Sequence, residues 1–417
     1  MRLHKLLATL AAILAGVTAV NAQNELSPYS QKAYGILSDK TTGAQRAMGG
    51  VGYAMNNGRQ INAMNPASYA ACDSLTFLWD IGFDMTNLWQ TEDDLHGYTF
   101  GGGLDYIAMQ FPITKNIGAS IGLMPFSEVG YSFAAEIDEG TESRTGDGGI
   151  NQLYAGAAYS FKKIPFIDNI SLGFNFSYQF GTITNDNYTY TESSSVTQFE
   201  HVLEIRDWGI EFGLQMTKKF GRKHALTLGV TYTPAKDVHG KTWATYYNAT
   251  SDSDVDTVGY QKMGGDFTYP YKIGVGLNYT YDQRFTVEAD FTYQNWSDAK
   301  FKDIELFSST ELNDRYRAAL GFQIIPKHRG NFIQRTSYRF GGYYTRDYIS
   351  IRGNELREYG VAVGFGLPSM YTKTTINLGF ELKHRETSPV NYISENYFNI
   401  TLGVTFDEMW FWKNKIR

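Results

Sequence analysis

The most regular feature of the chain is an alternation of apolar and polar residues with a period of two, which starts after Ser74 and continues to the end. Successive side chains of a β-strand point to opposite faces, so the alternation predicts strands with one apolar and one polar face. The clearest segment, 285–294, places on one face Phe285, Val287, Ala289, Phe291 and Tyr293, and on the other Thr286, Glu288, Asp290, Thr292 and Gln294.

We count fourteen such segments, centred on Trp79, Ala108, Ile121, Ala157, Phe174, Phe212, Leu228, Val275, Ala289, Leu320, Gly342, Val363, Leu378 and Leu402. An even number of antiparallel strands is typical of single-chain barrels in bacterial outer membranes. No stretch after the N-terminus has the roughly 18 consecutive apolar residues of a membrane helix. The pattern therefore predicts an all-β fold, a transmembrane antiparallel β-barrel of about 14 strands over residues 74–417. A count of thirteen or sixteen strands is also compatible with it.

The connections between these segments alternate between short and long. The short ones are 112–116, 218–223, 282–283 and 368–373, and the long ones are 138–149, 184–199, 248–267 and 297–312. Outer-membrane barrels have short periplasmic turns and longer outer loops, so this asymmetry predicts that the chain enters the barrel from the periplasm. A soluble β-sandwich is the alternative, but it would not sort its connections by length.

The N-terminus has the features of a secretory signal. Three basic residues within the first five positions precede an apolar run over residues 6–20, and small residues follow at the end of the run. This predicts a signal peptide at residues 1–22 and a mature chain that starts at Gln23. The alternative, a single transmembrane anchor, would need a longer apolar run.

The composition agrees with a barrel. Aromatic residues make up 15% of the chain, with 30 Tyr and 27 Phe, whereas charged residues make up 19%. Such a Tyr- and Phe-rich profile is typical of a closed sheet with one face in lipid. The net charge of −6, without a basic stripe, gives no case for nucleic-acid binding.

The polar faces of the predicted strands carry the charged residues. Placing them on the lipid face would cost about 2–4 kcal/mol each near the middle of the membrane. We therefore expect a lumen lined by Asp80, Asp84, Glu211, Lys272, Glu288, Asp290, Arg317, Arg339, Glu381 and Lys383. Any barrel would sort its charges inward, so this lining alone does not indicate a specific binding role.

Residues 23–73 lack the strand pattern. Within them, 43–67 is rich in Gly and Asn and ends in Asn65-Pro66-Ala67, a sequence that favours a turn. Small residues let the backbone pack tightly in irregular shapes. A barrel of about fourteen strands leaves an open lumen unless something fills it, so we expect residues 23–73 to form a plug, or hatch, inside the barrel. The alternative is a disordered tail, although this segment lacks the charge excess of disordered chains.

The third predicted strand is interrupted. It runs over 117–124 and then meets Pro125, and the alternation falters over 126–131. Proline lacks the N–H of the ladder, so inside a strand it marks an edge, a bulge or a break. In a closed barrel, an interrupted ladder is an opening in the wall. Candidate residues for a lateral opening are Pro125, Phe126, Ser127 and Gly130; an ordinary bulge is the alternative.

The order of signal peptide, Gly-rich segment and fourteen strands resembles the FadL/TodX family of outer-membrane transporters for long-chain fatty acids and aromatic hydrocarbons. The local match consists of Gly43, Arg46-Ala47, Gly49-Gly50-Val51-Gly52 and Asn65-Pro66-Ala67, which lead into the first strand at Leu75-Thr76-Phe77. Segments 270–276 and 291–297 resemble the middle strands of that family. The resemblance covers essentially the whole mature chain, and its most specific part is the plug.

The resemblance implies passive uptake of hydrophobic small molecules, such as long-chain fatty acids, across the outer membrane of a Gram-negative cell. The substrate would enter a pocket in the lumen and leave sideways at the kinked third strand when the hatch rearranges. The hatch residues that match the family are Gly43, Arg46, Gly49, Gly50, Gly52, Asn65, Pro66 and Ala67. The implied partners are the hydrophobic substrate, outer-membrane lipid and the barrel-assembly machinery, and no cofactor is implied.

A second hypothesis is an interaction role, because some members of this fold family serve protein secretion systems. Long polar connections such as 185–198 and 251–256 would suit contacts with secretion-system proteins. A general aqueous porin is disfavoured by the predicted plug.

Catalytic motifs are absent from the sequence. It contains no G-x-S-x-G, H-E-x-x-H, P-loop or C-x-x-C pattern, and its seven histidines are scattered. The sequence therefore predicts a protein that is not an enzyme, without a catalytic residue, metal site or cofactor.

Overall fold

The computed structural model describes residues 27–138, 140–191, 196–251, 254–263, 267–301, 312–369 and 372–409. The predicted signal peptide and the start at Gln23 lie outside these residues.

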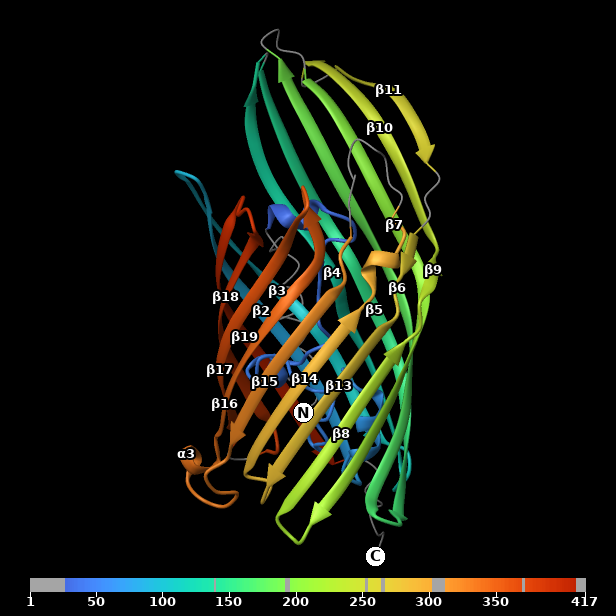
Figure 1. The fold of residues 1–417 in the computed structure, drawn as a ribbon, viewed down its shortest axis with the longest axis vertical. Coiled ribbons are helices and arrows are strands. Elements are labelled where there is room, and N and C mark those ends of the chain that lie inside the picture. Colours follow the sequence, from blue (N-terminus) through green and yellow to red (C-terminus); the bar gives the residue numbers. More distant parts are fainter. Residues whose placement is uncertain are drawn as a thin grey trace, which may run out of the picture.

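Fourteen strand positions close into an antiparallel barrel (Figure 1). The strands are β2 (Thr76–Glu92), β3 (Leu95–Pro112), β4 (Ile117–Ile137), β5 (Gly140–Ile164), β6 (Ile167–Thr191), β7 (Val196–Phe220), β8 (His224–Thr233), β13 (Lys272–Tyr281), β14 (Phe285–Gln294), β15 (Arg315–Ile324), β16 (Ser337–Ile351), β17 (Asn354–Pro368), β18 (Thr375–Ser388) and β19 (Ser394–Met409). The last strand pairs with the first from Ser394–Thr91 to Met409–Thr76 and completes the ring. Each predicted segment centre lies in one of these strands, so the predicted barrel is confirmed.

At two places in the ring, two strands lie one above the other: β8 below β10 (Gly240–Ser251), and β13 below β11 (Asp254–Met263). The lower part of β7 pairs with β8, and its upper part pairs with β10. β10 in turn pairs with β11, which lies above β13. Between the two levels, β9 (Lys236–Val238) and β12 (Phe267–Tyr269) form a separate two-stranded sheet.

One side of the barrel rises far above the other (Figure 1). Here β5, β6 and β7 are each 25 residues long, whereas β13, β14 and β15 have 10 residues each. The prediction of long outer loops at 138–149, 184–199 and 248–267 was therefore wrong, since most of these residues belong to strands β5, β6, β7, β10 and β11. The residues on both faces of this wall are largely polar, so its sequence does not alternate between apolar and polar residues. Its Thr and Tyr residues nevertheless favour strands.

The two faces of the strands differ as expected. Large apolar side chains are exposed on the outer face, among them Leu153, Phe174, Phe212, Val275, Leu277, Phe291, Leu320, Phe340, Val363 and Leu402. The inner face carries buried polar residues, including Asp80, Glu211, Glu288, Asp290, Arg317 and Arg339 from the predicted lumen set. In the described part of the chain, no helix is long and apolar enough to cross a membrane.

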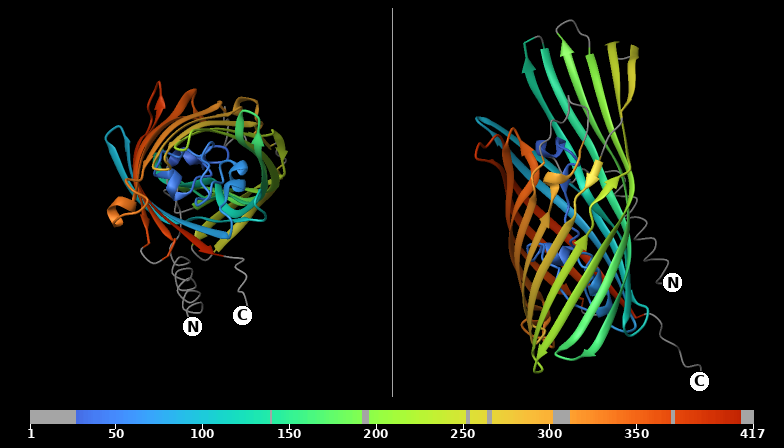
Figure 2. Two further views of the ribbon diagram at one scale, coloured as in Figure 1. Left: turned by 90° about the horizontal axis from the view of Figure 1, so that it is seen from below. Right: turned by 45° about the vertical axis from the view of Figure 1, so that its right-hand side comes forward.

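Residues 27–73, called the N-terminal segment below, lie inside the ring of strands (Figure 2). This segment contains η1 (Pro28–Gln31), β1 (Ile36–Leu37), α2 (Gly43–Arg46) and η2 (Pro66–Ala71). Glycines on the inner face of the barrel let its backbone approach closely. A Cβ atom on Gly341 would lie 2.0 Å from the carbonyl carbon of Met48, and one on Gly229 would lie 1.9 Å from the carbonyl oxygen of Tyr53. The remaining short helices are η3 (Trp296–Asp298) and α3 (Phe332–Arg335).

Candidate functional site

The wall of the barrel is interrupted between β3 and β4. These strands pair only from Pro112–Gly118 to Ile107–Leu123. Above Leu123, β4 continues to Ile137 and stays paired with β5, but the described ladder contains no further pair between β4 and β3. The upper parts of β3 and β4 are therefore not paired with each other.

The interruption coincides with the predicted break at Pro125. The register of β4 against β5 shifts there, because Pro125 pairs with Asn151 and Ser127 pairs with Ile150, which leaves Phe126 as the extra residue of a bulge. Proline lacks the N–H that a ladder would need. The ring of Phe126 lies 5.0 Å from that of Tyr269 in the lumen.

The N-terminal segment covers the free edge of β4. Its short strand β1 pairs with β4 through Leu37–Ser127 and Ile36–Glu128. The N–H of Ser38 donates a hydrogen bond to the carbonyl of Phe126 over 2.9 Å. Nearer the start of the segment, the Ser30 hydroxyl accepts a hydrogen bond from the N–H of Gly130 over 3.0 Å. Residues of the segment thus occupy the side of β4 on which β3 is missing.

Arg46 and Gly43 fix the short helix α2 of the segment to the wall. The Arg46 guanidinium forms ion pairs with Asp84 over 3.1 Å and with Asp105 over 2.7 Å. The N–H of Gly43 donates to the Tyr106 hydroxyl over 2.7 Å. The sequence analysis identified Arg46, Gly43 and Asp84, but not Asp105 or Tyr106.

The glycines that follow α2 bend the backbone around inward-facing charges. Gly49 and Gly50 have φ angles of 73° and 76°, which side chains strongly disfavour. The carbonyl of Gly49 accepts a hydrogen bond from Arg317 over 3.0 Å. The N–H of Gly52 donates to the Asp290 carboxylate over 2.6 Å, so a buried carboxylate meets a backbone donor.

Asn65, Pro66 and Ala67 form the start of η2. The side-chain oxygen of Asn65 accepts from the N–H of Ala67 over 3.0 Å, and its amide donates to the carbonyls of Tyr53 and Leu214 over 2.7 and 3.2 Å. Pro66 occupies the first helical position, where its missing N–H costs nothing. The Asn65 side chain therefore links the start of η2 both to Tyr53 of the same segment and to Leu214 of β7.

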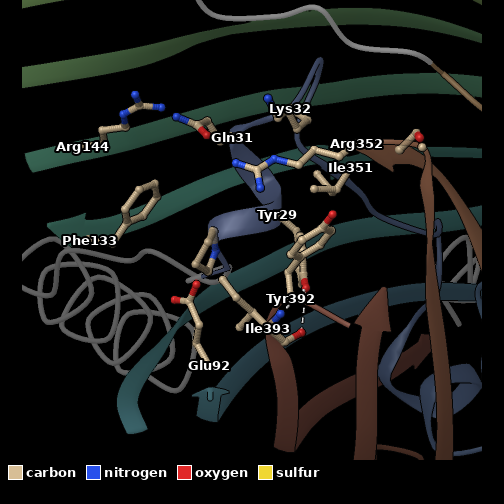
Figure 3. A pocket seen from close by; sticks show the side chains of 13 residues that line it. Tyr29, Gln31, Lys32, Glu92, Phe133, Arg144, Ile351, Arg352, Tyr392 and Ile393 are labelled. Carbon is tan, nitrogen blue, oxygen red and sulfur yellow. Dashed lines mark hydrogen bonds between the residues drawn. The ribbon is translucent and has the colours of Figure 1, made fainter. Parts of the chain in front are cut away.

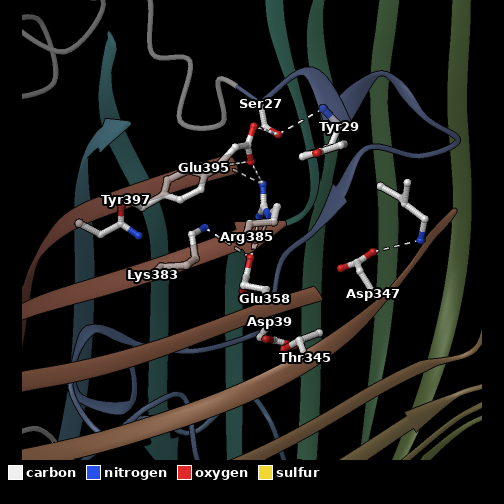
Figure 4. A network of polar contacts seen from close by, with 12 residues as sticks. Ser27, Tyr29, Asp39, Thr345, Asp347, Glu358, Lys383, Arg385, Glu395 and Tyr397 are labelled. Carbon is white, nitrogen blue, oxygen red and sulfur yellow. Dashed lines mark hydrogen bonds and ion pairs between the residues drawn. The ribbon is translucent and has the colours of Figure 1, made fainter. Parts of the chain in front are cut away.

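A network of ion pairs that was not predicted from the sequence lies on the inner face of β17, β18 and β19, next to the start of the N-terminal segment (Figure 4). Arg385 contacts Glu358 over 2.7 Å and Glu395 over 3.4 Å, and the Ser27 hydroxyl donates to Glu395 over 2.7 Å. Arg385, Glu358 and Glu395 lie on the neighbouring strands β18, β17 and β19, whereas Ser27 is 368 residues from Glu395 in sequence. The only sequence signal was that each charged residue sits at a polar position of an alternating strand.

Asp39 is the corresponding missed residue in the N-terminal segment. Its carboxylate lies 3.1 Å from Arg317 and 3.4 Å from Arg315. Burial would raise the pKa of Asp39, but the two guanidinium groups outweigh burial and hold this pKa below its usual range. Asp39 therefore joins the segment to β15 as a carboxylate.

Two larger cavities adjoin the segment, besides one of about 140 Å³ that is lined by Asp39, Arg46, Gly49 and Arg317 among others. The first, called the lumen pocket below, has a volume of about 290 Å³ and is lined by Leu37, Pro125, Phe126, Tyr269 and Trp296 among others. The second opens at the upper mouth (Figure 3), measures about 890 Å³ and is lined by Lys32, Phe133, Arg144, Arg352 and Tyr392 among others. Ser127 and Gly130 line neither cavity.

The fold is similar to that of solved outer-membrane channels. A Pseudomonas aeruginosa FadL homologue matches with a TM-score of 0.58 and 11% identity, covering 89% of this chain and 99% of that one. The P. putida toluene transporter TodX matches with a TM-score of 0.57 and 12% identity over the same shares. The Ralstonia pickettii toluene transporter TbuX matches with a TM-score of 0.53 and 14% identity, covering 88% and 98%. The resemblance to the FadL/TodX family is confirmed at the level of the fold.

The closed barrel, its apolar outer face and these structural relatives identify the chain as an outer-membrane β-barrel. No curated protein matches the sequence. A family model with the description BamG matches residues 3–417. The chain therefore belongs to the BamG family.

Proposed function

We propose that this barrel takes up hydrophobic small molecules across the outer membrane and releases them sideways between β3 and β4. One observation carries the proposal: the β3–β4 ladder ends at Leu123, and residues 36–38 occupy the free edge of β4 directly above. The lumen pocket borders the same place through Pro125 and Phe126. A substrate in this pocket needs only a shift of residues 36–38 to reach the membrane.

The contacts of the N-terminal segment support a gate that is confined to its first part. Strand β1 is held by two residue pairs, and a hydrogen bond contributes only about 0.5–1.5 kcal/mol net. Residues 43–67 are held by ion pairs and hydrogen bonds to several strands. We therefore assign the moving part of the hatch to residues 36–38, because residues 27–30 are held by hydrogen bonds of Ser27 with Glu395 and of Ser30 with Gly130. The predicted hatch residues from Gly43 to Ala67 act as its fixed base.

A reversible tether between paired residues tests the gate. Leu37→Cys with Ser127→Cys, made together with Cys72→Ser, places two thiols on a cross-strand pair. Oxidation should abolish uptake of radiolabelled palmitate or toluene into proteoliposomes, and reduction should restore it. The control is Ala119→Cys with Ala157→Cys, a pair inside the β4–β5 ladder. Equal uptake by the oxidised and reduced Leu37–Ser127 tether would overturn the proposal.

The tall wall favours a second candidate, a protein-interaction role within an outer-membrane machine. A transmembrane strand needs about 9–11 residues, whereas β5, β6 and β7 have 25 each. The upper wall also exposes Tyr190, Tyr246, Val258 and Tyr260. Exposed aromatic residues on a rigid sheet suit contacts with a protein, and the barrel-assembly machinery or a secretion system would be the partner class.

Co-purification tests this candidate separately. The full chain, isolated from its own membranes with mild detergent, should retain stoichiometric protein subunits. A variant with Tyr190→Ser, Tyr246→Ser and Tyr260→Ser should lose them while it keeps the heat-dependent gel mobility of a folded barrel. Isolation as a single chain from mild detergent would contradict the interaction role and leave the uptake proposal standing.

A further inference from the structure

The cavity at the upper mouth, called the mouth pocket below, is built from separate parts of the chain (Figure 3). The start of the N-terminal segment supplies Tyr29 and Lys32, and the upper wall supplies Phe133 of β4 and Arg144 of β5. The turn between β16 and β17 supplies Arg352. The volume of about 890 Å³ is within the range of ligand pockets, roughly 300–1,000 Å³. The mouth pocket shares no lining residue with the lumen pocket.

Three basic side chains line one side of the mouth pocket: Lys32, Arg144 and Arg352 (Figure 3). Lys32 is half-buried, and neither its ammonium nor the Arg352 guanidinium forms an ion pair among the described residues. Burial lowers the pKa of Lys32, and the positive charges of Arg144 and Arg352 lower it further. Lys32 is therefore close enough to both guanidinium groups to be repelled by them.

Two carboxylates adjoin the mouth pocket without neutralising it. Glu142 lies 3.0 Å from the Arg144 guanidinium. Glu92 lines the other side of the pocket (Figure 3), and it forms no ion pair with Lys32 or Arg352 among the described residues. Three cations beside two carboxylates leave an excess of positive charge, on a chain whose net charge is −6. The pocket is therefore suited to an anion.

Arg352 occupies a turn position that rarely holds an arginine. Ile351 pairs with Asn354, so Arg352 and Gly353 form a hairpin loop of two residues. Their φ angles are 50° and 79°, and positive values at both positions are the pattern of a type I′ turn. Asn, Asp or Gly is strongly preferred at the first of these positions, because other side chains rarely adopt a positive φ. The turn itself therefore does not explain the arginine, whereas a role for its guanidinium in the pocket does.

The rest of the lining is largely aromatic and aliphatic. It includes Tyr29, Phe133, Tyr392 and Ile393. The Tyr29 hydroxyl donates to the carbonyl of Ile393 over 2.6 Å and accepts from its N–H over 3.0 Å, so the Tyr29 ring is held in place. The Arg352 guanidinium lies 5.6 Å from the centre of the Tyr392 ring. A ligand that combines an anionic group with a ring-shaped body would match both parts of the lining.

We propose that the mouth pocket binds a phosphorylated saccharide. Its phosphate accepts hydrogen bonds from Lys32, Arg144 and Arg352, and its sugar ring packs against Tyr29 and Tyr392. A phosphate offers three acceptor oxygens and about −1.5 to −2 charges near neutral pH, which suits three cations better than a carboxylate with two oxygens and one charge. The bound phosphate relieves the repulsion between the cations. Two sources carry this chemistry, the headgroup of a phosphorylated glycolipid in the outer leaflet and a free sugar phosphate.

Binding to the purified full chain in detergent tests the site. The probes are glucosamine 1-phosphate, titrated by calorimetry, and lipid A, followed by native mass spectrometry. We expect binding of the phosphorylated probes but not of glucosamine, and weaker binding at high salt, which screens the charges. Binding of glucosamine 1-phosphate, alone or together with lipid A, shows that the free sugar phosphate is sufficient. Binding of lipid A alone identifies a membrane glycolipid, and all three outcomes support the site.

Arg352→Asn separates binding from folding. Asparagine is favoured at this turn position, so the thermal unfolding midpoint should stay the same or rise. The affinity for the phosphorylated probe should nevertheless fall about tenfold, the loss expected for one charge-assisted contact. Lys32→Gln should weaken binding to a similar extent. The control is Arg329→Gln, which removes an exposed arginine from the connection between β15 and β16, near α3 at the other end of the barrel (Figure 1).

Three results would overturn the site. They are a lack of binding by both phosphorylated probes, equal binding of glucosamine with and without its phosphate, and equal affinity in the wild type, Arg352→Asn and Lys32→Gln. The oxidised Leu37–Ser127 tether should still bind the phosphorylated probe, because neither residue lines the mouth pocket. This measurement distinguishes a failure of the saccharide site from a failure of the uptake proposal.

Discussion

Leu37 of the N-terminal segment pairs with Ser127 of β4 at the height where β4 no longer has β3 as a neighbour. The segment therefore acts as a substitute strand of only two residues. A substitute of this length closes the ladder without locking it, since each hydrogen bond contributes little. The stability of this short pairing relative to the rest of the segment is the property to measure first.

Hydrogen exchange should separate the two parts of the N-terminal segment. Ser38→Pro removes the Ser38 N–H, which donates to the Phe126 carbonyl of β4 over 2.9 Å. We expect faster exchange at residues 36–38 and at 126–130, with unchanged protection at 43–55. Ser38→Ala is the control, because it keeps the N–H that donates to Phe126. Faster exchange over the whole segment in the proline variant would show that its two parts move as one unit.

Removing the Arg46 guanidinium should strongly destabilise the N-terminal segment in its position inside the barrel. Arg46→Met leaves Asp84 and Asp105 without their common partner, and breaking such a buried pair costs about 3–5 kcal/mol. The expected result is a lower thermal unfolding midpoint in detergent. Adding Asp84→Asn and Asp105→Asn should recover part of the loss, because no unpaired charge then remains.

Arg59→Met is the matched control for Arg46→Met. Arg59 also forms an ion pair within the N-terminal segment, with Asp73 over 3.2 Å, but both side chains are more than half exposed. Exposed ion pairs contribute little, so the midpoint should stay within the error of the measurement. A similar shift in both variants would mean that the fall does not arise from the buried position of Arg46.

The sequence predicted the barrel well because period-two alternation is a direct consequence of strand geometry in a wall between lipid and lumen. The interruption at Pro125 was also predictable, since proline cannot complete a ladder. The tall wall was not, because residues such as those at 184–191 carry polar groups on both faces of the strand and lack an apolar face. A strand that is polar on both faces has the same sequence pattern as a polar loop.

The sequence could not predict the gap between the two ladders of β7 or the ion pairs of the lumen. β7 pairs with β8 up to Phe212 and with β10 from Ile205, and the gap between these ladders arises because Lys236–Val238 pair with β12, while the alternation along β7 itself continues undisturbed. Asp39 and Arg317 lie in different parts of the chain, and only the closed ring brings them together. Contacts of this kind depend on the barrel's circumference and register.

We expect Gly341 to be required for the N-terminal segment to pack against the inner wall of the barrel. A Cβ there would lie 2.0 Å from the backbone of Met48, which cannot move aside without displacing the turn at Gly49. We expect Gly341→Val to raise single-channel conductance in planar bilayers, because a displaced segment leaves the lumen open. Gly342→Ala is the control, since its Cβ would lie 3.3 Å from its nearest neighbour, the Gly360 carbonyl oxygen. Equal conductance in both variants would argue against tight seating at Met48.

The stability of the barrel should fall in acid through Asp39. Its pKa lies below the usual value of about 3.9, so its ion pairs contribute stability that is present above that value and is lost as pH falls toward the folded-state pKa. The thermal midpoint of the wild type should therefore decline below about pH 4. Asp39→Asn should start from a lower midpoint at pH 7 and decline less, because it cannot pair with Arg315 and Arg317 at any pH. Parallel pH curves for the two proteins would show that the acid sensitivity arises from other carboxylates.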